Sequence, residues 1–398
     1  MAQKKSSTQQ RSSSGLNRNL AIGAIFVILA LAGYYLLTGS DPLGLFTPTE
    51  TEIPTQIAGD TPPGGSNSDW WEVYFTDPNT INNPDNLVGS IPEKLIELIN
   101  SSKKSIHIAA FEFNLTPVAE ALIKAHQRGV DVKWVTDDEN GIDADTEEGH
   151  GQFKMLMDAG IEVIDDGRGA LMHNKFWIFD GQTVWTGSTN ITQNGNFRNN
   201  NNVIVIQSTR LAAIYEREFQ EMWDGKFGPR SPSTVNDQSI TINGTPIQAL
   251  FAAEDEVISK LIPLVQNAKT SIRFMAFSFT HDELGAAVLA RAKAGVDVMG
   301  IFETRGSETE FSELPKLYCA GVPVRQDGNP GTFHHKVFII DNNIVITGSL
   351  NFSENADDSN DENVLIITNP DIAKLYLQEF ERRWAEAEKP DPTAMNCK

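Results

Sequence analysis

One polar pattern occurs twice in this chain. Residues 172–190 read MHNKFWIFDGQTVWTGSTN, and residues 333–351 read FHHKVFIIDNNIVITGSLN. Each copy fits H-x-K-x4-D-x6-G-S-x-N, with every polar residue of the pattern at the same spacing. Because recurrence at identical offsets is very unlikely to arise by chance, the repeat indicates a duplicated unit with a shared chemical role.

The similarity between the two halves extends beyond this pattern. Segment 105–111, SIHIAAF, corresponds to segment 271–277, SIRFMAF, and each is followed by a helical pattern that ends at Gly129 or Gly295. Glycine suits the residue after a helix, where the backbone turns left-handed. The alternation of strands and helices predicts an α/β fold with largely parallel strands. We expect two similar domains packed face to face, with one site between them.

The N-terminal part differs in composition from the rest. A basic tail precedes residues 20–37, which carry no charge and are about long enough to cross a bilayer as a helix. Because positive residues favour the cytoplasmic side, we expect a single-pass protein with a cytoplasmic tail and extracytoplasmic domains. The alternative is a cleaved signal peptide and a secreted protein. The predicted organisation is a disordered tail at 1–19, a transmembrane anchor at 20–38, a flexible linker at 39–69, and domains at 70–229 and 246–388.

The net charge of the chain bears on nucleic-acid binding, and its two cysteines bear on disulfides and metal sites. The net charge is −21, and an acidic protein repels nucleic-acid backbones at long range, which argues against a general nucleic-acid binder. Cys319 and Cys397 could pair in an oxidising compartment, but two cysteines form neither a disulfide framework nor a metal site.

In each copy of the pattern, the histidine and the lysine are placed to act together. His173 and Lys175 are two residues apart on an apolar, strand-like run, and so are His334 and Lys336. Side chains at i and i+2 of a strand point to the same face, so His335 should point the opposite way. The pattern also supplies hydroxyl and amide groups that could bind a phosphate, from Ser188, Asn190, Ser349 and Asn351.

This set of side chains suits a phosphodiester. Lysine and asparagine donors would stabilise the negative charge that grows on the phosphoryl oxygens. One imidazole can attack phosphorus to form a phospho-histidine, and the other can protonate the leaving oxygen and then deprotonate water. Because the lysines supply the positive charge, the sequence predicts neither a catalytic metal nor a cofactor. Asp180 and Asp341 each end a strand-like run, and we expect them to pin the turns that follow.

The duplicated pattern resembles the signature of the phospholipase D superfamily, commonly called HKD. The resemblance covers about residues 70–388, and it is specific for the superfamily but not for a substrate. It implies a bilobal α/β protein, two domains packed with pseudo-two-fold symmetry, with both motifs at the shared interface. It also implies that the N-terminal histidine, His173, is the nucleophile and that His334 is the acid/base.

Many members of this superfamily carry an acid downstream of the motif that orients the histidine of the same half. The second half has Glu362 at this position, whereas the first half has Asn201. A carboxylate raises the basicity of an imidazole, whereas an amide only orients the ring. We therefore expect Glu362 to orient His334 and Asn201 to orient His173.

The favoured function is a membrane-anchored phosphodiesterase that hydrolyses phospholipids. Three alternatives stay open: an extracytoplasmic endonuclease of the same superfamily, a phosphatidyl transferase similar to cardiolipin synthase, and a catalytically silent binding protein. The head group of the substrate and the oligomeric state are left undetermined by the sequence.

Overall fold

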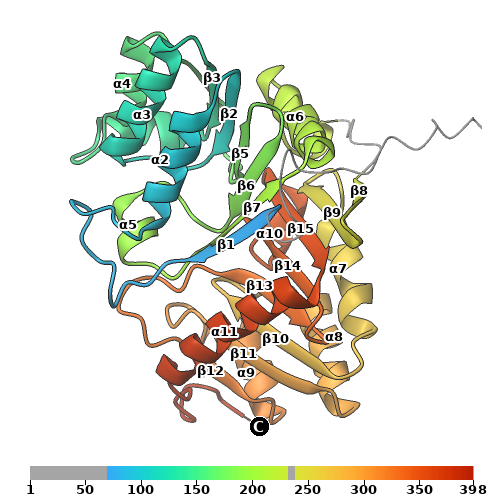
Figure 1. The fold of residues 1–398 in the computed structure, drawn as a ribbon. Coiled ribbons are helices and arrows are strands. Elements are labelled where there is room, and N and C mark those ends of the chain that lie inside the picture. The colour runs from blue at the N-terminus through green and yellow to red at the C-terminus, as the bar shows by residue number, and fades with distance from the viewer. Residues whose placement is uncertain (1–69, 232–237, 398) are drawn as a thin grey trace, which may run out of the picture. The chain divides into compact units, whose positions relative to one another are not determined.

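The computed structural model describes residues 70–231 and 238–397. The predicted tail, anchor and linker, residues 1–69, lie outside the described residues. Within the described ranges, no helix is both long and apolar enough to cross a membrane. We call residues 70–231 the first lobe and residues 238–397 the second lobe; they run from blue to green and from yellow to red in Figure 1.

The first lobe is built on a seven-stranded sheet with the strand order β1-β7-β6-β5-β2-β3-β4. Its strands are β1 (Trp71–Phe75), β2 (Ser105–Ala110), β3 (Asp131–Thr136), β4 (Glu162–Asp165), β5 (Lys175–Phe179), β6 (Thr183–Gly187) and β7 (Asn202–Gln207). Its α-helices are α2 (Ile91–Ser101), α3 (Thr116–Gln127), α4 (Gln152–Asp158), α5 (Gln193–Phe197) and α6 (Thr209–Trp223). A π-helix spans Asp138–Asp143, and 3-10 helices span Ala144–Thr146 and Gly228–Arg230.

The second lobe is built on an eight-stranded sheet with the order β12-β11-β10-β13-β14-β15-β9-β8. Its strands are β8 (Ser239–Ile242), β9 (Thr245–Ala252), β10 (Ser271–Ala276), β11 (Asp297–Phe302), β12 (Val324–Gln326), β13 (Lys336–Ile340), β14 (Ile344–Gly348) and β15 (Glu362–Thr368). Its helices are α7 (Val257–Gln266), α8 (Asp282–Lys293), α9 (Glu313–Cys319), α10 (Glu354–Asp358) and α11 (Pro370–Glu386).

The expectation of largely parallel strands is wrong, because both sheets are mixed. Strands β2, β3 and β4 run parallel, as do β10, β11 and β12, but β5 pairs antiparallel with both β2 and β6. The cause is the short connection between β5 and β6, residues 180–182, because parallel neighbours need a crossover of a dozen or more residues. The second lobe has the same short connection at 341–343.

The motif aspartates hold these short connections in place. Asp180 and Asp341 have positive φ angles of 55° and 53°. The Asp180 carboxylate accepts hydrogen bonds from the backbone N–H groups of residues 103–105, and the Asp341 carboxylate accepts them from residues 269–271. Each aspartate thus ties the turn after its motif strand to the start of the neighbouring strand.

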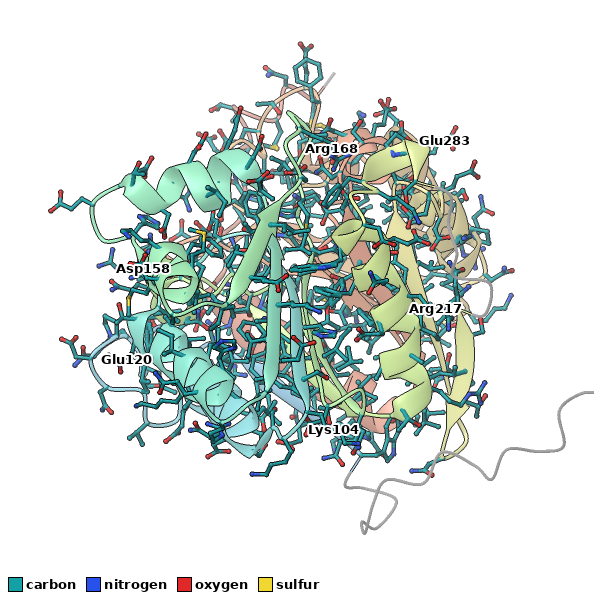
Figure 2. The ribbon with its side chains drawn as sticks, turned by 90° about the horizontal axis from the view of Figure 1, so that it is seen from above. Lys104, Glu120, Asp158, Arg168, Arg217 and Glu283 are labelled. Carbon is teal, nitrogen blue, oxygen red and sulfur yellow. A yellow bond between two sulfur atoms is a disulfide. The ribbon has the colours of Figure 1, made fainter. Side chains whose placement is uncertain are left out.

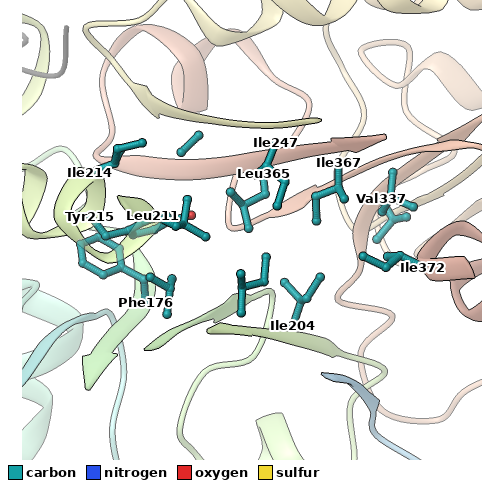
Figure 3. Close-up of a cluster of buried hydrophobic side chains, with 14 of the residues drawn as sticks. Phe176, Ile204, Leu211, Ile214, Tyr215, Ile247, Val337, Leu365, Ile367 and Ile372 are labelled. Atoms are coloured by element: carbon teal, nitrogen blue, oxygen red, sulfur yellow. The ribbon is translucent and has the colours of Figure 1, made fainter. Parts of the chain in front are cut away.

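Among the described residues, one of three buried apolar clusters takes side chains from both lobes, and each lobe also has a cluster of its own. Figure 3 shows part of this cluster, which takes Phe176 and Tyr215 from the first lobe and Leu365 from the second. The ring centroids of Tyr215 and Phe251 lie 5.2 Å apart, so α6 packs beside β9, as Figure 1 also shows. Burial of large apolar side chains from both lobes stabilises their association, which fixes the geometry of any site between them.

Corresponding helices begin in the same way in the two lobes. The side chain of Ser208 accepts a hydrogen bond from the N–H of Leu211 at the start of α6, and that of Asn369 accepts one from Ile372 at the start of α11. Both are favoured N-cap residues.

In the second lobe, a disulfide joins Cys319, the last residue of α9, to Cys397, so the two cysteines pair.

Candidate active site at the lobe interface

The two motif histidines lie where the lobes meet. His173 precedes β5, His334 precedes β13, and both are buried. The backbone N–H of His173 donates to the carbonyl of Asp361, and that of His334 donates to the carbonyl of Asn200, each at 2.9 Å. Each lobe therefore holds the backbone of the other lobe's histidine.

The side chains that orient the histidines also come from the opposite lobe. Nδ1 of His173 lies 2.8 Å from both carboxylate oxygens of Glu362. Nδ1 of His334 lies 3.0 Å from Oδ1 of Asn201 and 3.0 Å from the carbonyl oxygen of Ser188. Because Nδ1 is engaged in both rings, Nε2 is the nitrogen left for chemistry in each.

This pairing corrects the expectation that each histidine is oriented within its own half. Asn201 precedes β7 and Glu362 begins β15, and both strands start at the interface. The side chains of Asn201 and Glu362 therefore reach across the interface. A linear sequence does not reveal this crossing, because the repeat looks the same whether the halves orient their own histidines or exchange these residues.

Each motif lysine is held over an aromatic ring. Nζ of Lys175 donates to the carbonyl of His173 at 2.9 Å and lies 5.0 Å from the centroid of Phe111. Nζ of Lys336 donates to the carbonyl of His334 at 3.0 Å and lies 4.7 Å from the centroid of Phe277.

Both lysines are almost fully buried, at 3% and 1% exposed. The two rings were not singled out in the sequence, although Phe111 and Phe277 occupy matching positions after β2 and β10. The ring faces and the carbonyls fix the ammonium groups beside the histidines.

The motif serines contact the orienting residues. Oγ of Ser188 donates to Oδ1 of Asn201 at 2.7 Å, and Oγ of Ser349 donates to Oε2 of Glu362 at 2.6 Å. These hydroxyls also accept from the backbone N–H of Asn202 and Asn363. In this structure the serines support the side chains that hold the histidines, whereas the sequence assigned them to the phosphate.

The motif asparagines differ between the lobes. Nδ2 of Asn190 donates to Oε2 of Glu112 at 2.8 Å. Oδ1 is buried without a hydrogen-bond partner among the described residues in both Asn190 and the corresponding Asn351, so the lobes differ in the Glu112 contact. Glu112 follows Phe111 directly, and the second lobe has Ser278 at that position. Glu112 was not predicted from the sequence, and its only signal there is its place just after a strand that reaches the site.

Burial and the two ammonium groups make the site electrostatically unusual. Burial, with the charges of Lys175 and Lys336, lowers the pKa of both His173 and His334 well below the ordinary value. Both imidazoles are therefore neutral at neutral pH. A neutral imidazole offers a lone pair for attack or for accepting a proton.

Burial also shifts the pKa values of the ionisable groups beside the histidines. It lowers the pKa of Lys175 to about 8, and it lowers that of Lys336 well below its usual range. It raises the pKa of Glu362 to about 8. A phosphodiester anion bound here would stabilise the protonated lysines, because opposite charges at close range favour both charged forms.

Two groups of three carboxylates among the described residues lie close enough together to hold an ion. They are Asp137, Asp138 and Asp166, and Glu218, Glu221 and Glu254. Neither group contains a motif residue.

Comparison with known proteins places these features in a family. The family model described as "Cardiolipin synthase, PLD-like domain" matches the chain twice, at residues 95–223 and 261–384. Over 161 residues, the chain is 36% identical to a phospholipase D from Rickettsia bellii, a match that covers 40% of this chain and 80% of that protein. Over 132 residues, it is 39% identical to the mitochondrial cardiolipin hydrolase of Xenopus tropicalis, with 33% of this chain and 63% of that protein covered. The chain thus spans less than two thirds of the length of that hydrolase.

A solved structure has the same two-lobed fold over a longer range. Phosphatidylserine synthase from Haemophilus influenzae superposes with a TM-score of 0.58 at 16% identity, over 79% of this chain and 87% of that one. At this identity the likeness concerns the fold alone.

Proposed function

We propose, because the chain belongs to the phospholipase D superfamily and carries its PLD-like domain in two copies, that it is a phosphodiesterase that hydrolyses phospholipids. The observation that carries this proposal is the pair of buried imidazoles, each fixed through Nδ1 by a residue of the opposite lobe. Such a pair leaves two Nε2 atoms beside two ammonium groups, which is what a two-step displacement at phosphorus requires.

We assign the nucleophile to His173. When Nε2 attacks phosphorus while Nδ1 keeps its proton, the ring becomes positively charged. The Glu362 carboxylate at 2.8 Å from Nδ1 would stabilise that charge in the transition state and in the phospho-histidine. The family resemblance points to the same residue, but the physical reason differs from the one expected from sequence, since the carboxylate faces the nucleophile.

We assign proton transfer to His334. Its Nδ1 faces an amide oxygen and a carbonyl oxygen, and neither group has a full charge that would hold the ring permanently protonated. An imidazolium formed in the presence of the bound anion can therefore release its proton readily. That property suits a general acid that later acts as a general base.

The reaction then proceeds through two displacements at phosphorus. In the first, the P–Nε2 bond to His173 forms and the bond to the head-group oxygen breaks, while His334 gives its Nε2 proton to that oxygen. In the second, His334 takes a proton from water, the water oxygen attacks phosphorus, and the P–N bond breaks. The products are the free head-group alcohol and a phosphatidic acid.

Phospholipid is favoured over nucleic acid as the substrate for two reasons. The net charge of −21 repels a polyanion. Relatives that share 36–39% identity are named cardiolipin hydrolase and phospholipase D. We expect cardiolipin and other phospholipids to be turned over at the predicted extracytoplasmic face, next to the anchor predicted at residues 20–38.

The test of the substrate is a side-by-side comparison. Purified protein should be given phosphatidylcholine, cardiolipin and single-stranded DNA at equal phosphodiester concentration, and release of head group, phosphatidic acid and nucleotide should be measured. We expect lipid turnover to exceed DNA cleavage by at least about 100-fold, the size of discrimination that a dedicated site provides. Preferential DNA cleavage would replace this proposal with the endonuclease, and formation of a new phosphatidyl ester in the presence of glycerol would favour the transferase.

A further inference from the structure

One acidic side chain lies beside the active site in only one of the two lobes. Phe111 and Glu112 follow β2 in the first lobe, and Phe277 and Ser278 take the same places after β10 in the second. The ring of Phe111 packs edge-on against that of His173, with the centroids 4.9 Å apart. Glu112 is therefore placed next to the site by its neighbour, and the second lobe has a short, uncharged side chain instead.

The Glu112 carboxylate contacts a motif side chain. Its Oε2 accepts a hydrogen bond of 2.8 Å from Nδ2 of Asn190, the amide that the repeated pattern predicts to bind phosphate. The side chain of Glu112 is only partly buried. A phosphate held by Asn190 would therefore lie close to a carboxylate that solvent can reach.

The negative charge of Glu112 also acts on the motif lysine of its lobe. Burial lowers the pKa of Lys175, and the charges of Glu362, Glu112 and Asp137 oppose this shift. Glu362 and Asp137 are almost completely buried, at 0% and 1% exposed. Of these three acids, Glu112 is therefore the one that a bound molecule can approach.

Glu112 has no positive partner within the described ranges. Its hydrogen bond comes from the neutral amide of Asn190, and no basic side chain forms an ion pair with it there. In the second lobe, by contrast, Glu303 opposes the lowering of the Lys336 pKa by burial and has Nε of Arg305 at 2.9 Å from its Oε1. An uncompensated carboxylate attracts positive groups and repels negative ones at close range.

A phosphodiester bound between the two histidines would meet this carboxylate with its head group. In choline and ethanolamine head groups, only two carbon atoms separate the nitrogen from the ester oxygen, so the positive charge stays close to phosphorus. Glycerol brings no positive charge, and the phosphatidylglycerol part of cardiolipin brings a second negative one. The energy of interaction with Glu112 therefore differs in sign between these classes of head group.

We propose that Glu112 is a specificity-determining residue, which favours phospholipids with a positively charged head group over those with a neutral or anionic one. This inference rests on the proposed function and narrows its substrate class. The lysines cannot make the distinction, because the phosphate that they would bind is common to all phospholipids. Ser278 cannot make it either, because it carries no charge.

The test compares dihexanoyl-phosphatidylcholine with dihexanoyl-phosphatidylglycerol, both as dissolved monomers, using the full chain. Monomers avoid the repulsion between an anionic vesicle and an acidic protein. We expect kcat/KM of the wild type to be higher for phosphatidylcholine. Glu112→Gln keeps an acceptor for Asn190 but removes the charge, so the ratio of the two kcat/KM values should fall by about tenfold, the effect of one nearby charge in a partly solvated site.

Two further variants separate the charge of Glu112 from other effects. Glu112→Ser introduces the side chain of the second lobe and should change the ratio as Glu112→Gln does. Glu120→Gln makes the same change in net charge on the exposed face of α3, at the edge of the first lobe in Figure 2, and should leave the ratio unchanged. All three variants should cleave bis(p-nitrophenyl) phosphate, whose ester groups are uncharged, which checks that their sites are folded.

Each other outcome counts against the proposal. An unchanged ratio in Glu112→Gln, or an equal fall in Glu120→Gln, would overturn it. A change in Glu112→Ser alone would also overturn it, because the effect would then come from the hydrogen bond to Asn190. Loss of all three activities in Glu112→Gln would mean that Glu112 serves the reaction itself and does not select the head group. If the wild type cleaves bis(p-nitrophenyl) phosphate but neither lipid, the proposed function fails, and this inference fails with it.

Discussion

Glu362 and Asn201 occupy corresponding positions but give the two histidines different environments. Glu362 places a carboxylate on Nδ1 of His173, whereas Asn201 places an amide oxygen on Nδ1 of His334. The difference in charge is the physical basis for assigning attack to one ring and proton transfer to the other.

This asymmetry predicts a distinctive pH profile. The Glu362 carboxylate can stabilise the charge that develops on His173 only when the pair that these two side chains form has lost one proton, and burial raises the pKa of Glu362 to about 8. We expect kcat/KM to rise with pH towards about 8. Above it, kcat/KM should fall because Lys175, whose pKa is about 8, loses the charge that binds the phosphoryl oxygens.

The variant Glu362→Gln should remove the rising part of this profile. An amide does not titrate in this range, and burial holds the pKa of His173 well below its ordinary value, so its Nε2 stays free. The maximum rate should fall by about 10²–10³-fold, the usual effect of losing one electrostatic contact to the transition state. The exposed variant Glu147→Gln is the control, and a rising limb that persists in Glu362→Gln would contradict the assignment of the titrating pair.

Both histidines should be required for turnover. We expect His173→Ala and His334→Ala each to lower kcat by at least about 10³-fold, and the double variant to be no worse than the worse single one, because the two rings act as a unit. The measurement is initial rate on phospholipid with circular dichroism as a check on folding. Substantial activity in either single variant would argue against a shared site.

At the scale of single residues, the motif residues could be predicted from the sequence, but their partners could not. The identities of His173, Lys175, His334 and Lys336 follow from the repeat, because spacing alone places each histidine and lysine on one face of a strand. The partners of the histidines do not follow, because they depend on how the two lobes pack. Glu112 is missed for the same reason, since its contact with Asn190 joins separate segments.

At the scale of the elements, the end of β6 is where the site is assembled. Gly187 has a φ of 153°, and a Cβ atom there would lie 2.2 Å from the carbonyl oxygen of Asn202. This close approach of β6 and β7 brings Ser188 to Asn201. Gly348 repeats it in the second lobe, where a Cβ would lie 2.1 Å from the carbonyl oxygen of Asn363.

The variant Gly187→Ala should therefore be strongly destabilised. We expect its free energy of unfolding to fall by more than about 2 kcal/mol, because the clash is with backbone that cannot move aside. The comparison is Gly129→Ala, also at a positive φ of 89° but with no atom within 4 Å of the added Cβ, which should cost about 1 kcal/mol. Equal losses in the two variants, measured by urea unfolding, would mean that the approach of β6 to β7 is not tight.

The elements themselves were partly predictable. The strand and helix patterns of each half appear where the periodicity indicates them, and Gly129 and Gly295 have the left-handed φ expected after a helix. The direction of β5 and β13 was predicted wrongly, because alternation of strands and helices suggests crossovers while a three-residue link permits only a hairpin.

At the scale of the whole molecule, catalysis should not depend on a metal ion. The motif side chains belong to neither carboxylate group found among the described residues. We expect EDTA to leave the initial rate unchanged, because the lysines supply the positive charge at the site. An immediate loss of rate in folded protein, restored by added Mg²⁺ or Zn²⁺, would refute a mechanism in which lysines supply the positive charge.

The N-terminal segment should set location and leave the chemistry unaffected. Residues 1–69 share nothing with the repeat, so a chain that begins at Trp70 should fold and keep its kcat on a soluble phosphodiester. Its rate on phospholipid vesicles should fall, because the anchor predicted at 20–38 no longer holds it at the surface. If the shortened chain is insoluble, the linker at 39–69 has been misjudged.

The sequence predicted two similar domains and one shared site. It could not predict which lobe supplies the partner of each histidine, because that depends on how the two lobes pack. The pairing of Cys319 with Cys397 was likewise open, because two cysteines alone do not determine whether their backbones approach.

Trapping the covalent intermediate tests most directly whether His173 attacks phosphorus. A substrate labelled on the phosphatidyl side should be mixed with enzyme and quenched within milliseconds at alkaline pH, where the P–N bond of phospho-histidine survives, and the labelled peptide should be mapped by mass spectrometry. We expect label on His173, and none in His173→Ala. Label on His334 would reverse the two roles, and the argument from the Glu362 carboxylate would be wrong.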